Sequence, residues 1–121
     1  MLLAIDVGNT NIVLGVFERT ELIRSWRLQT LRERTSDELG LLVKGLFDNF
    51  KIDRSGVTGS IVGSVVPPLT GTVFAMVAQY FNHAPLVVDP ARNSHSGGME
   101  YPTLITGGAY FLEGDRRDSP G

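Results

Sequence analysis

The chain has 121 residues, 42% of them apolar and 20% charged, which is enough for one domain that buries about 65% of its unfolded surface. Its formal net charge of −2 gives no electrostatic basis for binding nucleic acid or an anionic membrane, and the absence of cysteine excludes disulfides and thiolate metal sites. The sequence has no apolar run of ~18 residues and no basic N-terminal signal segment, so we expect a cytoplasmic protein without a membrane partner.

Three strands open the predicted domain. The first covers residues 2–6 and the second covers residues 11–18. Because both faces of the second strand are apolar, we expect it to lie inside a sheet and not at its edge. A third strand is predicted over residues 22–29, after the polar turn at residues 19–21.

A helix is predicted over residues 36–50. Thr35 and Glu38 have the spacing of a capping box, and apolar residues follow at helical spacing. Gly40 and Gly45 are unfavourable in a helix interior. Their presence predicts that this helix packs closely against a sheet.

The remaining pattern predicts a strand, a helix and a strand. A β-branched run over residues 57–66 is the fourth strand, and Pro67-Pro68 stops it and begins the second helix. Residues 85–89 form a short fifth strand. The resulting order, βββαβαβ, resembles the ribonuclease-H-like half-domain, an α/β fold found in actin, sugar kinases and Hsp70.

The turn between the first two strands is the candidate functional site. Asp6 ends a buried strand, and Gly8 lets the chain turn and lets a ligand approach the backbone. Asn9 and Thr10 add short polar side chains and N–H groups, which are typical of a phosphate cradle. A carboxylate repels phosphates, so this arrangement predicts a bridging Mg²⁺. The alternative is that Gly8-Asn9 is an ordinary hairpin turn.

Several other polar residues have two interpretations. Arg32 and Arg34 belong either to a solvated loop or to a segment that approaches bound nucleotide phosphates. Trp26 is expected to be half-buried on its strand and not to stack on nucleic acid bases. His83 is expected in a solvated turn and His95 in a loop, and neither has a second metal ligand at a useful spacing for zinc.

Four stretches, in order, resemble the type III pantothenate kinases. They are residues 6–11 (DVGNTN), 34–38 (RTSDE), 64–68 (SVVPP) and 98–101 (GMEY). The resemblance implies the fold of the acetate and sugar kinase/Hsp70/actin group. It also implies transfer of the ATP γ-phosphate to the primary hydroxyl of pantothenate, in the first step of coenzyme A biosynthesis. Mg²⁺, a monovalent cation (K⁺ or NH₄⁺) and a homodimer are implied as well.

The resemblance assigns roles to the residues of the first motif. Asp6 would hold Mg²⁺ and help to place the γ-phosphate, which makes it the candidate catalytic residue. The phosphates would be cradled by the residues of the turn, Gly8, Asn9, Thr10 and Asn11.

The pattern changes near the C-terminal end. Tyr101 matches the family tyrosine that contacts pantothenate, although a partly exposed loop aromatic is an equal alternative. Gly108 and Ala109 fit the substrate-binding stretch that follows, but Tyr110 stands where the family has its catalytic aspartate. A phenol with a pKa near ~10 is a poor general base at neutral pH.

These observations predict a phosphate-binding half-domain over residues 1–102 and a divergent, irregular tail over residues 103–121. The family's second half is then missing. We therefore expect a pantothenate kinase or, alternatively, a catalytically inactive half-domain that serves at most as a nucleotide-binding or interaction module.

Overall fold

The computed structural model describes residues 1–88. Its elements are, in chain order, β1 (Leu2–Val7), β2 (Asn11–Glu18), β3 (Glu21–Gln29), α1 (Ser36–Asn49), the short 3₁₀ helix η1 (Arg54–Gly56), β4 (Gly59–Ser64), α2 (Pro67–Phe81) and β5 (Leu86–Val88). The predicted order of strands and helices is confirmed. Within residues 1–88, no helix is both long enough and apolar enough to cross a membrane.

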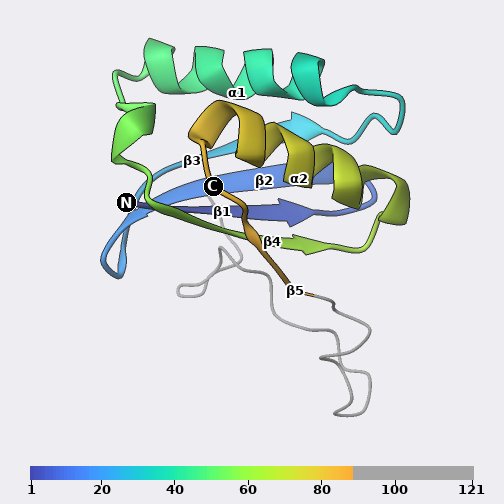
Figure 1. Ribbon diagram of the computed structural model, residues 1–121, viewed down its shortest axis with the longest axis horizontal. Coiled ribbons are helices and arrows are strands. Elements are labelled where there is room, and N and C mark those ends of the chain that lie inside the picture. The colour runs from blue at the N-terminus through green and yellow to red at the C-terminus, as the bar shows by residue number, and fades with distance from the viewer. Residues whose placement is uncertain (89–121) are drawn as a thin grey trace.

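The five strands form one mixed sheet with the order β3-β2-β1-β4-β5. β1, β2 and β3 pair antiparallel as a meander, whereas β4 pairs parallel with β1 and β5 pairs parallel with β4. β2 therefore has a neighbour on each side, as its two apolar faces predict. Figure 1 shows α1 and α2 on the same side of this sheet.

The core lies between the sheet and the two helices. Leu3, Ile5 and Val7 of β1 are fully buried and pack with apolar residues of both helices, including Phe47 and Met76. Successive side chains of a strand point to opposite faces. Leu2, Ala4 and Asp6 consequently lie on the face of the sheet that carries no described helix.

The start of α1 follows its predicted capping box. The Glu38 amide donates to the Thr35 hydroxyl at 3.1 Å, and the Thr35 amide donates to the Glu38 carboxylate at 2.8 Å. These two bonds satisfy two of the amide groups that a helix leaves unpaired at its first turn. The helix ends one residue before the predicted end, with Phe50 as its C-cap.

The packing predicted for the two glycines of α1 is wrong. A Cβ at Gly40 would fall on the ring of Tyr80, so this glycine allows α1 to approach the helix α2 and not the sheet. A Cβ at Gly45 would meet nothing within 4 Å. Gly45 is exposed, and nothing in the structure explains why this position is a glycine.

β4 is shorter at both ends than the predicted run of residues 57–66. Before the strand, the Asp53 side chain accepts from the Ser55 amide at 3.0 Å and caps η1, which carries the chain through Val57. After the strand, the Ser64 hydroxyl accepts from the Val66 amide at 3.1 Å, which turns the chain into α2. Both ends are set by local side-chain bonds that compete with strand pairing.

Candidate functional site

The β1–β2 turn is closed by a backbone hydrogen bond from the Gly8 amide to the Asn11 carbonyl, at 2.9 Å. An added Cβ at Gly8 would lie 3.1 Å from that same carbonyl oxygen, which is closer than ordinary contact. Glycine thus lets the turn close this tightly without a shift of the Asn11 carbonyl. The hairpin alternative is correct as a description of the backbone, and it leaves a phosphate-binding role open.

Thr30, the first residue after β3, holds the turn in place. Its amide donates to the Thr10 carbonyl at 2.9 Å, and its hydroxyl donates to the Gly8 carbonyl at 2.7 Å. Two carbonyl oxygens of the turn are therefore engaged by Thr30. Sequence reasoning missed Thr30, because its signal is only a polar residue at the end of a strand that pairs beside the turn.

The turn also has free hydrogen-bond donors. Within residues 1–88, the amide groups of Asn9 and Thr10 donate to no acceptor, and both residues are exposed. Successive unpaired backbone N–H groups in a turn are suited to an anion such as phosphate.

Arg32 reaches the turn from the β3–α1 connection. Its Nη2 atom donates to the Asn9 side-chain oxygen at 3.3 Å, and the rest of the side chain is exposed. The structure thus places this arginine at the candidate site. Whether it meets a bound phosphate stays a prediction.

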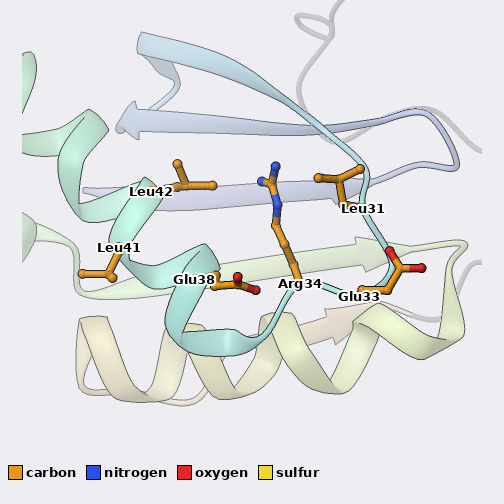
Figure 2. Close-up of a pocket in the computed structure, with 6 residues that line it drawn as sticks. All are labelled: Leu31, Glu33, Arg34, Glu38, Leu41 and Leu42. Carbon is orange, nitrogen blue, oxygen red and sulfur yellow. The ribbon is translucent and has the colours of Figure 1, made fainter.

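Arg34 takes a different course. Figure 2 shows its guanidinium between Leu31 and Leu42, in a groove of about 590 Å³ whose other lining residues are Glu33, Glu38 and Leu41. Its Nη1 atom is buried and has no hydrogen-bond partner within the described residues. Two arginines that are two positions apart are therefore separated, one toward the turn and one into the groove.

Asp6 lies beside the turn on the helix-free face of the sheet. In the parallel register its neighbour on β4 is Gly63, which has no side chain to cover the carboxylate. The Asp6 side chain makes no hydrogen bond or ion pair within residues 1–88, and it is half-buried. Burial removes water from the carboxylate and raises its pKa to about 6 from the usual 3.8.

A half-buried carboxylate without a partner fits a divalent cation. No three His, Cys, Asp or Glu side chains gather as a metal site in the described part of the chain. Asp6 alone does not make a closed protein cage. One carboxylate combined with substrate phosphates and water is, however, the way in which proteins commonly hold Mg²⁺.

The histidine expectation needs a correction, and several other expectations lie beyond residue 88. His83 follows α2, but its imidazole is held by Ser60 Oγ at 2.8 Å and by the Phe81 carbonyl at 2.9 Å. Trp26 is half-buried, as predicted. The predictions that lie outside the described residues concern Tyr101, Gly108, Ala109, Tyr110, His95, Asp89 as the strand end and the boundary at residue 102.

Two solved structures share this arrangement of strands and helices. A putative N-acetylglucosamine kinase from Porphyromonas gingivalis superposes with a TM-score of 0.55 at 10% identity, over 74% of this chain and 34% of that one. A ROK hexokinase from Thermus thermophilus superposes with a TM-score of 0.55 at 14% identity, over 80% of this chain and 38% of that one. At such identities the likeness shows the fold alone, and it confirms the predicted α/β half-domain fold, which both sugar kinases contain.

Relatives with higher sequence identity are named type III pantothenate kinase. The type III pantothenate kinase of Desulforapulum autotrophicum is 50% identical over 91 residues, which are 75% of this chain and 35% of the relative. That of Myxococcus xanthus is 52% identical over 90 residues, 74% of this chain and 35% of the relative. The chain thus spans about a third of the length of these relatives. The sequence model of the type III pantothenate kinases matches residues 2–104, and the chain belongs to this family.

Proposed function

We propose that this chain is the phosphate-binding half of a type III pantothenate kinase, which transfers the γ-phosphate of ATP to pantothenate in the first step of coenzyme A biosynthesis. The observation that carries the proposal is the turn at residues 8–11, where, within residues 1–88, two amides without an acceptor lie close in the chain to the Asp6 carboxylate, which has no partner there. Free donors suit the phosphates, and the carboxylate suits the cation that accompanies them.

The turn would act by positioning the phosphates. Phosphoryl transfer depends mainly on alignment and on neutralising charge, so a fixed backbone matters more than a reactive side chain. Asn9, Thr10 and Asn11 would hold the phosphate oxygens, and Gly8 keeps the turn tight. Thr30 supports this role because it engages the carbonyl oxygens of the same turn.

Asp6 would hold Mg²⁺, directly or through water. When bound, the ion would neutralise negative charge on the phosphate oxygens. Desolvation makes the Asp6 carboxylate a poor anion by itself, as its raised pKa indicates. The family also implies K⁺ or NH₄⁺, for which we assign no residue. We place the reaction in the cytoplasm.

Tyr101 would contact pantothenate, with Gly108 and Ala109 beside it in the same substrate-binding stretch. Tyr110 occupies the position of the family's catalytic aspartate. The proton of the pantothenate hydroxyl would then need an acceptor other than a carboxylate at that position. A partner chain could supply one, since we also propose that the protein forms a homodimer.

The second candidate is a half-domain without catalytic activity that binds nucleotide or another protein. It is favoured by Tyr110, because a phenol stands where the family has its catalytic aspartate. In this case phosphate binding at the turn would persist without turnover.

A coupled ADP-release assay with ATP, Mg²⁺, K⁺ and pantothenate separates the two candidates. Under the kinase proposal, release depends on pantothenate and is abolished by Asp6→Asn. Asp53→Asn is the matched control, because Asp53 is an exposed carboxylate that caps η1 away from the turn. If a folded wild-type sample releases no ADP, this chain is not a kinase by itself and the second candidate replaces the first.

A further inference from the structure

We propose that Arg32 is a phosphate-contacting residue of this site and that the Asn9 side chain positions it. The inference rests on the proposed function and adds a cationic side chain to the turn. It is carried by the contact between Arg32 Nη2 and Asn9 Oδ1, at 3.3 Å.

The backbone on both sides of Arg32 is fixed. On one side, Thr30 is bound to two carbonyl oxygens of the turn at residues 8–11, called the phosphate turn from here on. On the other side, the Arg34 amide donates to the Leu31 carbonyl at 3.1 Å, and α1 begins with its capping box. Arg32 thus projects from a short, doubly anchored segment and remains next to the turn.

No carboxylate in the described part of the chain neutralises the charge of Arg32. Its contact on Asn9 is a neutral amide oxygen, and within residues 1–88 it forms no ion pair. A guanidinium has five N–H donors, so a single bond to Asn9 leaves the others for an anion. Planar pairs of N–H groups match the spacing of phosphate oxygens.

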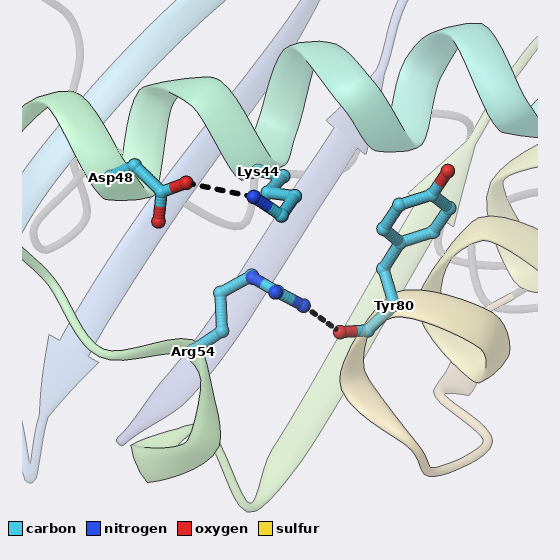
Figure 3. Close-up of polar contacts among 4 residues, drawn as sticks. All are labelled: Lys44, Asp48, Arg54 and Tyr80. Carbon is cyan, nitrogen blue, oxygen red and sulfur yellow. Dashed lines mark hydrogen bonds and ion pairs between the residues drawn. The ribbon is translucent and has the colours of Figure 1, made fainter.

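Other cations of the described chain are used elsewhere. In Figure 3, Lys44 pairs with Asp48 at 3.0 Å and Arg54 donates to the Tyr80 carbonyl at 2.6 Å. Arg24 lies over the Phe50 ring, 4.2 Å from its centroid. Among the described residues, Arg32 is the cation whose side chain is bonded to the phosphate turn.

The first test measures binding of inorganic tripolyphosphate to the full 121-residue chain by calorimetry at low salt. We expect Arg32→Ala to weaken binding about tenfold, the usual effect of losing a charge-assisted hydrogen bond at an exposed site. Arg32→Lys should recover part of the loss, since lysine keeps the positive charge but lacks the planar pair of N–H donors. The difference should shrink at high salt because exposed charges are screened.

Arg19→Asn is the matched control. It removes one positive charge from the β2–β3 turn, at the opposite end of β2 from the phosphate turn. Arg19 has a φ of 60°, and asparagine tolerates this conformation. We expect its affinity for tripolyphosphate to stay within twofold of the wild type, and a loss equal to that of Arg32→Ala would reduce the effect to net charge and overturn the proposal.

A double-mutant cycle tests the role of Asn9. Asn9→Ala keeps the backbone donor of the turn and removes the side-chain amide, whose oxygen holds Arg32. We expect it to weaken binding in the wild-type background and to have a much smaller effect in the Arg32→Ala background. Equal effects in both backgrounds would show that Asn9 does not act through Arg32.

The outcomes distinguish this inference from the proposed function. If tripolyphosphate binds to the wild type and to Arg32→Ala equally well, Arg32 has no role and the turn remains a phosphate site. If the folded wild type does not bind tripolyphosphate with or without Mg²⁺, the proposed phosphate site itself is wrong, and the role of Arg32 is wrong with it.

Discussion

The ionised Asp6 carboxylate lowers the stability of the fold, whereas in the proposed reaction the same charge would hold Mg²⁺. Its folded pKa, about 6, is raised above the usual 3.8, so the folded state binds the proton more tightly than the unfolded chain does. Stability therefore falls as the pH rises from about 4 to 6, and the loss is complete above that range. A bound cation would offset this loss.

The first prediction follows from this sign. Asp6→Asn should raise the free energy of unfolding by about 2–3 kcal/mol at pH 7.5, because it removes a desolvated charge. At pH 4 the variant and the wild type should be nearly equal, since Asp6 is then protonated in the folded state. Urea unfolding at several pH values measures the difference.

Asp53 provides the control for that series. Hydrogen bonds from Ser55 lower the pKa of this exposed carboxyl, so its stabilising contribution is present at neutral pH and is lost as the pH falls. Asp53→Asn should not stabilise the protein at pH 7.5. If Asp6→Asn does not stabilise it either, the Asp6 carboxylate has a partner in solution.

The second prediction concerns Thr30. Thr30→Val keeps the amide bond to Thr10 and removes the hydroxyl bond to the Gly8 carbonyl, which should cost about 1 kcal/mol. It should also loosen the turn and increase hydrogen exchange there. Thr58→Val is the control, since Thr58 is an exposed threonine whose amide bond to Met1 is retained. Equal exchange in the two variants would contradict the anchoring role.

At the scale of an element, α1 offers a comparison of one substitution at two positions. A methyl group at Gly40 would meet the Tyr80 ring and push apart α1 and α2, so Gly40→Ala should destabilise by about 1–3 kcal/mol. Gly45 has open space around it, and Gly45→Ala should stabilise by about 0.5–1 kcal/mol. Thermal unfolding of the two variants measures both signs. Destabilisation by both would mean that Gly45 has a contact in solution.

The same helix shows which features were predictable from the sequence. The capping box at Thr35 and the start of α2 at Pro67 depend on residues within three or four positions, and both were predicted correctly. The partner of Gly40 is forty residues away in the sequence, so local spacing could not identify it. For this reason the close packing of α1 was predicted, but the predicted packing surface was the sheet and the observed one is α2.

In the candidate site, too, features formed by neighbouring residues were predicted and features formed by distant residues were not. The turn at residues 8–11 was predicted because its polar residues are consecutive. Thr30 was missed because it contacts the turn only through the pairing of β2 with β3. For Arg32 and Arg34 the sequence left both interpretations open. The backbone of the β3–α1 connection separates them, and its course is not encoded in either residue.

At the scale of the whole molecule, the sheet is covered unequally. Within residues 1–88, both helices lie on one face (Figure 1). Apolar side chains on the other face are accessible, with Leu2 40% exposed and Leu86 66% exposed. Ile61 is the register partner of Leu86, Ala4 is the register partner of Ile61, and both lie on the same face between Leu2 and Leu86. Accessible apolar side chains gathered on one face are characteristic of an interaction surface.

The fourth prediction is that this face mediates self-association. Sedimentation equilibrium should give an apparent mass that rises with concentration above that of the 13.2 kDa chain. Leu86→Lys should shift the protein toward monomer, because a charge would have to lose water in the contact. Leu41→Lys is the control, since Leu41 is 64% exposed on α1, away from this face. A clean monomer at high concentration would contradict self-association, and equal shifts by both variants would move the contact to another surface. Because the proposed kinase lacks a carboxylate at residue 110, a monomer would also leave the missing proton acceptor without a partner chain to supply it.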